Sequence, residues 1–421
     1  MKNKIYKRKI ELLIKELLDE FRILYLTGPR QAGKTTLARM IAKDLGMTYI
    51  SLDDQTAFAS ARYDPHGFID SLKDRPIVLD EFQYAPELIK AIKLTSDLLA
   101  PGEFGRFFLT GSADIFKSAK TQEALPGHMA RIELYPLSVT EKTGSNFNLI
   151  NFLYAKQLSL PDNFTLLSRE QFAQTVLDGG YPELQGKGPR ARQIWFESYL
   201  QGRLYKDFDN IYSAKGDYYT KLEALIPYLA GLCGNLLKYA SVANDLGQND
   251  KIIKSYIEAL EWMFIIKRIH PYVKNAARRQ SIGMAKLHMV DTGLACYLLG
   301  LKKKQQLLES PFYGGLLESF VVMECFKHMS WAEETMNIYH FRDKRKNEVD
   351  IVLEQDDGLL IGIEVKASNT VRKNDFKGLK KFSSLLKEKF KFGLVFYTGS
   401  RLLPFGDNNN QYFAVPLSIL F

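Results

Sequence analysis

The sequence predicts an α/β protein with a parallel-sheet domain at its N-terminal end, a helical middle and a second α/β domain at its C-terminal end. Three patterns support this prediction. An apolar run and a glycine-rich loop lead into a helical repeat in residues 22–42, two helical stretches precede two β-like runs in 238–291, and strands with carboxylates follow a helix in 311–421. The chain has 421 residues, of which 46% are hydrophobic, and can therefore bury two or three cores.

The first pattern fits a phosphate-binding loop. Residues 23–26 are apolar enough for a buried strand, and residues 28–35 follow the spacing G-x-x-x-x-G-K-[ST] at the start of a helical repeat. Gly28 and Gly33 allow the backbone to approach phosphate closely, and the helix N-terminus favours negative charge. We expect Lys34 to reach the β- and γ-phosphates of ATP and the Thr35 hydroxyl to hold Mg²⁺. The expected nucleotide-binding residues are Gly28, Pro29, Arg30, Gln31, Ala32, Gly33, Lys34, Thr35 and Thr36.

An acidic pair at the end of another apolar run supplies the second half of a phosphoryl-transfer site. Residues 76–79 lead directly into Asp80 and Glu81. We expect Asp80 to bind Mg²⁺ through water, and Glu81 to act as the catalytic residue that orients and polarises the attacking water. Such a pair often caps a helix instead, but its place behind a phosphate loop favours the catalytic interpretation.

The rest of this domain contributes a covering helix and two further candidates. Residues 1–20 have the spacing of an amphipathic helix that covers the sheet. A strand over 106–112 has a polar end, Thr110-Gly-Ser112, which would lie beside the γ-phosphate in a doubly wound sheet. A hydroxyl there could sense phosphate, although an ordinary turn is an equally good explanation. Arg131 is a candidate charge-stabilising arginine that could act across a subunit boundary.

Composition narrows the class of protein. The formal net charge is +9, which is compatible with nucleic acid, although such a balance usually reflects only a lysine-rich exterior. No apolar stretch approaches the ~20 residues of a membrane span, and the basic first residues lack an apolar signal segment, so we expect a cytoplasmic protein with no membrane partner. The cysteines lie far apart in apolar, helix-like sequence and are expected to be buried thiols in a reducing compartment; they are Cys233, Cys296 and Cys325.

The middle of the chain is similar to a winged helix. A short helix, a capped second helix and two β-like runs follow one another over 241–247, 251–263, 264–273 and 286–290. The β-like runs flank a basic loop with Lys274, Arg278 and Arg279. The second helix would present Lys251 and Lys254 to a DNA groove. Winged helices also serve as packing or protein-contact modules, and the pattern alone does not separate these roles.

The C-terminal segment is similar to the restriction-endonuclease-like PD-(D/E)xK fold. A predicted helix contains Glu318, a strand contains Asp350, and the next strand places Glu364 and Lys366 on one face. We expect Glu318, Asp350 and Glu364 to bind Mg²⁺ or Mn²⁺, and Lys366 to activate water or to stabilise charge on a phosphate. The proline of the motif is absent before Asp350, which leaves cleavage open, and an exposed Glu–Lys pair on a sheet is the plain alternative.

A basic run follows these strands. A helix over 374–389 and a strand over 391–397 complete an α-β-β-β-α-β order, and a final strand over 412–420 follows. The basic residues of this helix and its flanks are Arg372, Lys373, Lys377, Lys380, Lys381, Lys387, Lys389 and Lys391. Such a run is usually a solvated face. Beside a nuclease-like sheet it is also where a phosphate backbone would lie, with salt-sensitive affinity that does not depend on sequence.

Several short motifs occur in a fixed order along the chain. They are Gly-Pro-Arg-Gln-Ala-Gly-Lys-Thr-Thr (28–36), Leu-Asp-Asp (52–54), Val-Leu-Asp-Glu-Phe-Gln-Tyr-Ala-Pro-Glu-Leu (78–88), Leu-Thr-Gly-Ser (109–112), Leu-Pro-Gly-His-Met-Ala-Arg-Ile-Glu-Leu-Tyr-Pro-Leu-Ser (125–138), Gly-Gly-Tyr-Pro-Glu (179–183) and Asp-Thr-Gly-Leu (291–294). This set resembles the prokaryotic AAA-type ATPases whose C-terminal half is a widespread domain of unknown function. Many relatives carry arginine where this chain has His128, so the resemblance implies no arginine-sensor role at that position.

The patterns predict four parts: an ATPase core (1–145), a helical junction (146–237), a winged-helix-like domain (238–300) and a nuclease-like domain (301–421). Our first hypothesis is an ATP-hydrolysing homo-oligomer that engages DNA through the last two parts, in DNA processing, branched-DNA remodelling, repair or defence. The alternative is a nucleotide-gated switch or scaffold that binds a protein partner and has a catalytically silent nuclease-like domain. A transcription regulator built on the winged helix is a third option.

Overall fold

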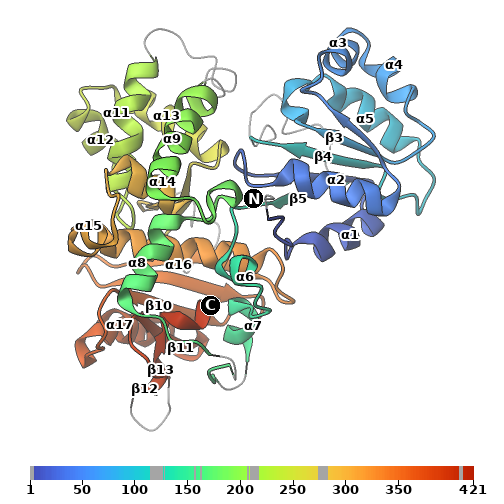
Figure 1. Ribbon diagram of the computed structural model, residues 1–421. Helices are drawn as coiled ribbons and strands as arrows, with labels where there is room; N and C mark the ends of the chain where they lie inside the picture. The colour runs from blue at the N-terminus through green and yellow to red at the C-terminus, as the bar shows by residue number, and fades with distance from the viewer. Residues whose placement is uncertain are drawn as a thin grey trace. The chain divides into compact units, whose positions relative to one another are not determined.

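The computed structural model describes residues 4–113, 127, 129–155, 158–161, 164–205, 208, 218–273, 283–406 and 411–421. The chain divides into two compact units (Figure 1). The N-terminal unit consists of Met1–Leu137, Tyr181–Glu183 and Trp262–Phe264, and the C-terminal unit consists of Ser138–Gly180, Leu184–Glu261 and Ile265–Phe421. The finer division into four parts stays a prediction.

A parallel sheet forms the centre of the N-terminal unit. Its strand order is β2-β3-β4-β1-β5, and every neighbouring pair is parallel. The strands are β1 (Ile23–Thr27), β2 (Thr48–Ser51), β3 (Ile77–Asp80), β4 (Phe107–Gly111) and β5 (Met129–Glu133). Because parallel strands end at the same edge, the residues that follow β1, β3 and β4 lie close together.

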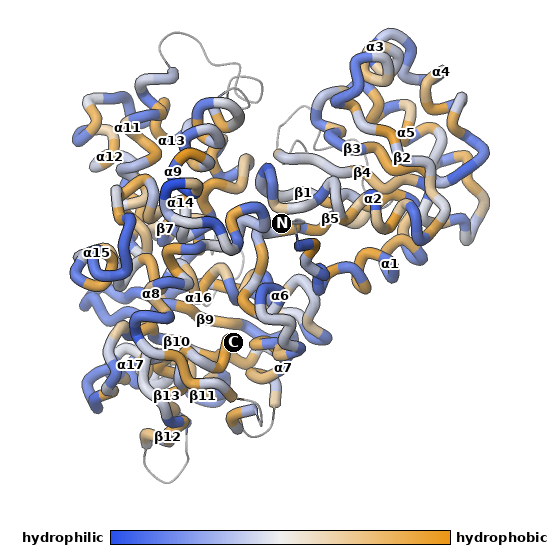
Figure 2. Tube along the Cα trace, viewed as in Figure 1, coloured by the Kyte–Doolittle hydropathy of each residue, from blue (hydrophilic) through white to orange (hydrophobic). Residues whose placement is uncertain are grey.

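Helices cover both faces of this sheet (Figure 1). They are α1 (Glu11–Glu20), α2 (Lys34–Leu45), α3 (Gln55–Tyr63), α4 (Pro65–Asp70) and α5 (Leu88–Asp97). Alternate strand residues point to opposite faces, so Leu24 packs with α1 and α2, whereas Tyr25 packs with α3 to α5. Figure 2 shows the alternation of hydrophobic and hydrophilic residues along α1, as expected for the predicted covering helix.

Helices and one hairpin form the first part of the C-terminal unit. The helices are α6 (Val139–Thr143), α7 (Leu149–Tyr154), α8 (Arg169–Asp178), α9 (Pro189–Tyr199), α11 (Tyr218–Gly231), α12 (Tyr239–Asp245), α13 (Asp250–Trp262), α14 (Thr292–Leu298), α15 (Lys304–Glu309) and α16 (Tyr313–Met329). After α12 and α13 come β6 (Ile266–Ile269) and β7 (Lys286–Met289), which pair antiparallel. This is the predicted order of helix, turn, helix and hairpin. Lys274, Arg278 and Arg279 of the predicted basic loop lie outside the described residues, as does His128.

A six-stranded mixed sheet forms the second part of this unit, in the order β12-β13-β11-β10-β9-β8. Its strands are β8 (Met336–Arg342), β9 (Glu348–Gln355), β10 (Leu360–Lys366), β11 (Phe390–Tyr397), β12 (Leu403–Pro404) and β13 (Tyr412–Pro416). Helix α17 (Lys377–Leu386) packs on β9, β10 and β11 through Leu379 and Phe382. The chain therefore has the α-β-β-β-α-β order that the sequence predicts. Among the described residues, no helix has the length and apolar character that a membrane crossing requires.

Replacing Gly315 by Ala should destabilise the C-terminal unit, whereas replacing the adjacent Gly314 should not. A Cβ at position 315 would lie 2.1 Å from the Cys233 carbonyl oxygen, but a Cβ at 314 would have no atom within 4 Å. Both positions lie in α16, so the gain in helix propensity is the same. We expect Gly315→Ala to lower the free energy of unfolding by about 1–3 kcal/mol, and Gly314→Ala to leave it unchanged or raise it slightly. Urea unfolding measures both, and equal midpoints would contradict this packing.

Candidate functional site

The loop between β1 and α2 has the backbone that a phosphate site needs. Gly33 has a φ of 101°, which favours glycine, and it directly precedes the first residue of α2. A Cβ on Gly28 would lie 2.1 Å from the Leu134 carbonyl oxygen, so only glycine fits at that position. Gln31, with a φ of 60°, also adopts the left-handed conformation, which reverses the direction of the backbone within the loop. The expected nucleotide residues 28–36 therefore form one compact loop and the first turn of α2.

Lys34 lies inside this loop. Its side chain is only 5% exposed, and its ammonium donates hydrogen bonds to the carbonyl oxygens of Gly28 and Pro29, both at 2.8 Å. Thr35 is half-buried and Thr36 is exposed at the start of α2. The ammonium is thus held at the loop by neutral oxygens, which the charged oxygens of a triphosphate can replace.

Asp80 lies at the carboxyl end of β3 and is 2% exposed. Tyr49 from β2 donates a hydrogen bond to its Oδ2 at 2.6 Å, and Thr110 from β4 donates to its Oδ1. Burial, together with this hydrogen bond to Asp80, raises the pKa of Tyr49 to about 12, so the phenol keeps its proton. The sheet order therefore brings Thr110 to Asp80, and its role in phosphate sensing stays a prediction.

Glu81 follows with a left-handed backbone (φ 58°), and a small polar network orients its carboxylate. Gln83 donates a hydrogen bond to its Oε2, and the Ser112 hydroxyl lies 3.4 Å from the same atom. Gln83 and Ser112 are also bonded to each other, at 3.0 Å and 3.2 Å. Arg30 of the loop lies 4.0 Å from the other oxygen, Oε1. The loop and the two strand ends thus converge on one carboxylate.

Arg8 is a loop contact that the sequence analysis missed. It is buried, and its guanidinium donates to the carbonyl oxygens of Ala32 at 2.6 Å and Tyr135 at 2.7 Å. It therefore ties the phosphate loop to the segment after β5. The predicted arginine Arg131 lies on β5, where its guanidinium is 3.7 Å from Glu133 of the same chain. A role of Arg131 across a subunit boundary stays a prediction.

The predicted nuclease-like residues converge in the C-terminal unit, together with a lysine that was not predicted. Lys286, the first residue of β7, is 3% exposed, and its ammonium lies 2.9 Å from Glu318 Oε1 and 2.9 Å from Asp350 Oδ1. The other Asp350 oxygen accepts the Val365 N–H at 3.0 Å. Glu364 pairs with Lys366 at 3.0 Å. We refer to Glu318, Asp350, Glu364, Lys366 and Lys286 as the carboxylate–lysine cluster.

Burial and mutual charge decide which groups of this cluster are ionised. Burial would lower the pKa of Lys286, but Asp350 and Glu318 outweigh burial and raise it above its ordinary value. Burial would raise the pKa of Asp350, yet Lys286 and the Val365 N–H lower it. Burial and then the charge of Asp350 raise the pKa of Glu364 to about 8, and they raise that of Glu318 well above its usual range. Asp350 is therefore the carboxylate that keeps its charge opposite Lys286.

The predicted metal site at this cluster differs from the observed arrangement. In the part of the chain that the structure describes, no group of three or more His, Cys, Asp or Glu side chains is placed to hold a metal ion. Glu318 and Asp350 contact the ammonium of Lys286 instead, and Glu364 contacts that of Lys366. The assignment of Glu318, Asp350 and Glu364 as metal ligands, and of Lys366 as catalytic, stays a prediction that this geometry does not favour.

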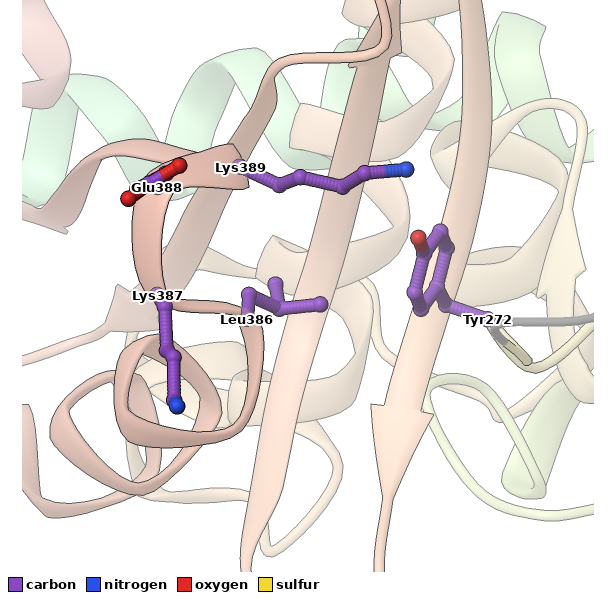
Figure 3. Close-up of a pocket in the computed structure, with 5 residues that line it drawn as sticks. All are labelled: Tyr272, Leu386, Lys387, Glu388 and Lys389. Atoms are coloured by element: carbon purple, nitrogen blue, oxygen red, sulfur yellow. The ribbon is translucent and has the colours of Figure 1, made fainter.

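Basic side chains form an exposed surface along α17 and the segments that flank it. Arg372, Lys373, Lys377, Lys380, Lys387 and Lys389 are exposed. A pocket of about 350 Å³ lies between the turn after α17 and Tyr272, and Leu386, Lys387, Glu388 and Lys389 also line it (Figure 3). In Figure 3, Leu386 and Lys389 point toward Tyr272, whereas Lys387 points away. The second helix of the helix–turn–helix, α13, exposes Lys251 and Lys254 in the same unit.

Comparison with known proteins assigns the class of the N-terminal unit. Residues 20–143 match the family model described as AAA domain. Residues 169–305 and 313–420 match two families that are each described as a domain of unknown function, DUF8612 and DUF4143. Together with the loop and the strand-end acids, the first match identifies a P-loop ATPase domain of the AAA type, followed by a helical middle and a C-terminal sheet domain.

Individual relatives match different shares of the chain. The chain is 26% identical over 366 residues to the uncharacterized protein Rv2008c of Mycobacterium tuberculosis. This alignment covers 87% of this chain and 75% of that protein. It is 33% identical over 103 residues to cytidylate kinase of Streptococcus pyogenes, which covers 24% of this chain and 44% of the kinase. Among solved structures, the Walker-type ATPase of Pyrococcus abyssi aligns with a TM-score of 0.43 and 15% identity, covering 70% of this chain and 97% of that one.

Replacing Arg8 by Ala should weaken ATP binding. The substitution leaves the Ala32 and Tyr135 carbonyl oxygens without their donor, which costs about 1–3 kcal/mol and loosens the loop. We expect the dissociation constant for ATP to rise about tenfold or more, with partial rescue by Arg8→Lys, because an ammonium cannot bridge both carbonyls as the forked guanidinium does. Calorimetric titration measures the affinity, and Lys7→Ala, at an exposed neighbour, is the control. An unchanged affinity in a folded Arg8→Ala protein would contradict this role.

Proposed function

We propose that this chain is an ATP-hydrolysing switch whose C-terminal unit engages DNA. The observation that carries the first half is the convergence of Lys34, Asp80 and Glu81 at one edge of a parallel sheet. Hydroxyl and carboxylate oxygens are the ligands Mg²⁺ prefers, and Thr35 and Asp80 offer them beside the loop. When bound, Mg²⁺ would neutralise charge on the β- and γ-phosphates.

Each residue of the site then has a distinct task in hydrolysis. Lys34 exchanges the Gly28 and Pro29 carbonyl oxygens for phosphate oxygens. Glu81 accepts the proton of the attacking water, and Gln83 and Ser112 fix the orientation of its carboxylate. Thr110 and Tyr49 hold Asp80 in place. Arg30, which lies 4.0 Å from Glu81, adds positive charge on the side of the loop.

Two surfaces support DNA engagement. The exposed lysines of α17 and its flanks form a basic face, and the helix–turn–helix with its hairpin presents Lys251 and Lys254. We propose contact with the phosphate backbone, in a process such as DNA remodelling, repair or defence, by a cytoplasmic homo-oligomer. One observation favours the alternative of a switch or scaffold with a silent nuclease-like domain, namely the ammonium of Lys286 between Glu318 and Asp350.

Glu81→Gln should separate binding from hydrolysis. The amide keeps the shape of the side chain but cannot accept a proton, so ATP binding persists while turnover falls by about 10²-fold or more. Lys34→Ala should lose both, because the phosphates lose their buried cation. Phosphate release and calorimetric ATP titration measure the two quantities. Glu87→Gln, at an exposed acid in the same segment, is the control and should behave as wild type. Full turnover in Glu81→Gln would remove Glu81 from the mechanism.

DNA binding should depend on salt and on the basic face of α17. Neutralising two phosphate contacts by Lys377→Ala and Lys380→Ala should reduce the slope of log affinity against log salt by about 1–2. Fluorescence anisotropy with labelled duplex and branched DNA measures this slope. The exposed pair Lys90 and Lys93 of the N-terminal unit, also changed to Ala, is the control. If the unmodified protein binds no DNA at low salt, and DNA does not stimulate its ATPase, the second half of the proposal fails.

A further inference from the structure

Lys286 occupies a fixed position at the centre of the carboxylate–lysine cluster. Its backbone is held on two sides, because it pairs with Ile269 across the hairpin and forms a bridge with Leu236. The neighbouring Leu287 adds hydrogen bonds to Gly234 at 2.9 Å and Asn235 at 3.0 Å. The side chain therefore enters the cluster from a braced strand.

The ammonium uses the oxygens that a metal would need. It lies 2.9 Å from one oxygen of Glu318 on α16 and 2.9 Å from one oxygen of Asp350 on β9. The second oxygen of Asp350 is bonded to the Val365 N–H at 3.0 Å, and Glu364 is bonded to Lys366 at 3.0 Å. Mg²⁺ requires about six oxygen ligands near 2.1 Å. An ammonium between the two carboxyl groups takes the space and the counter-charge that such an ion would use.

We propose that Lys286 is an internal cation that takes the place of a divalent metal, so that the cluster closes around a lysine and the C-terminal sheet domain does not cleave phosphodiester bonds. Hydrolysis at such a site needs a metal to bind the phosphate and to activate water. Lys366 alone cannot supply both effects, because its ammonium is paired with Glu364. The role of Lys286 is then structural, because its two ion pairs connect the β6–β7 hairpin to α16 and β9.

The proposal predicts that a metal ion can bind at this cluster once the ammonium of Lys286 is removed. If Lys286 is what excludes the metal, then removing the ammonium while keeping most of the apolar stem should open a cation site among Glu318, Asp350 and Glu364. Lys286→Met makes this change, because the unbranched methionine side chain ends one atom short of the ammonium position and carries no charge. The vacated space would be lined by the carboxyl oxygens of these three residues, which are the ligands Mn²⁺ and Mg²⁺ take.

The experiment titrates Mn²⁺ into the full-length, nucleotide-free protein and follows free Mn²⁺ by electron paramagnetic resonance. Wild type, Asp350→Asn, Lys286→Met and Lys286→Met/Asp350→Asn are compared, and Asp80→Asn identifies any Mn²⁺ held at the ATP site. We expect wild type and Asp350→Asn to bind alike. We expect Lys286→Met to gain one Mn²⁺ per chain with at least tenfold tighter affinity than wild type, and the double variant to lose it.

Two results would overturn the proposal. One is Mn²⁺ binding by wild type that disappears in Asp350→Asn, because the metal would then displace Lys286. The other is a folded Lys286→Met protein, with unchanged circular dichroism, that gains no Mn²⁺. If Lys286→Met does not fold, the comparison of wild type with Asp350→Asn decides alone. The measurement uses neither ATP nor DNA, so its outcome is independent of the proposed ATPase and DNA-binding functions.

Discussion

A charge that is removed from water needs a partner inside the protein, and this constraint shapes both sites. Lys34, Asp80 and Lys286 are 5%, 2% and 3% exposed. Two carbonyl oxygens of the loop accept hydrogen bonds from Lys34, and two hydroxyl groups donate hydrogen bonds to Asp80. Two carboxyl groups accept hydrogen bonds from Lys286. The partners of Asp80 and of Lys286 come from different elements, whereas both partners of Lys34 belong to its own loop. Pairing Asp80 and Lys286 therefore depends on the packing of elements that the apolar core produces.

The sequence predicts the ATP site wherever neighbours along the chain determine position. The loop, the first turn of α2 and the acids at the end of β3 are such cases, and they follow strands of one parallel sheet. The hydrogen-bond partners of these residues cannot be predicted in this way, because their positions depend on which strands are adjacent in the sheet. Tyr49 reaches Asp80 only because β2 pairs with β3, and Arg8 reaches the loop from before α1. No local pattern marks either residue.

The C-terminal unit shows the same limit at longer range. Spacing predicts Asp350 and Glu364 on adjacent strands, and β9 and β10 do pair. Lys286, however, is 32 and 64 residues from its two partners, and a lysine in a hairpin strand gives no sign of burial. Two motifs that looked separate also prove to be one packing unit. Asp291 accepts the Gly180 N–H at 2.6 Å, and a Cβ on Gly179 would lie 2.4 Å from the same carboxylate.

Whether a buried lysine can exchange its hydrogen-bond partners for a ligand depends on the chemistry of those partners. Lys34 is held by neutral carbonyl oxygens, and hydrogen bonds of this kind to a charged group each contribute about 1.5–3 kcal/mol net. Phosphate oxygens add a negative charge opposite the ammonium, so a triphosphate can take the place of these carbonyls. Lys286 is held by carboxyl groups in the interior, where breaking a buried pair costs about 3–5 kcal/mol. An incoming divalent ion would also leave this ammonium buried beside it with no carboxylate of its own. The first lysine is therefore suited to change partners with each nucleotide, and the second is suited to keep them.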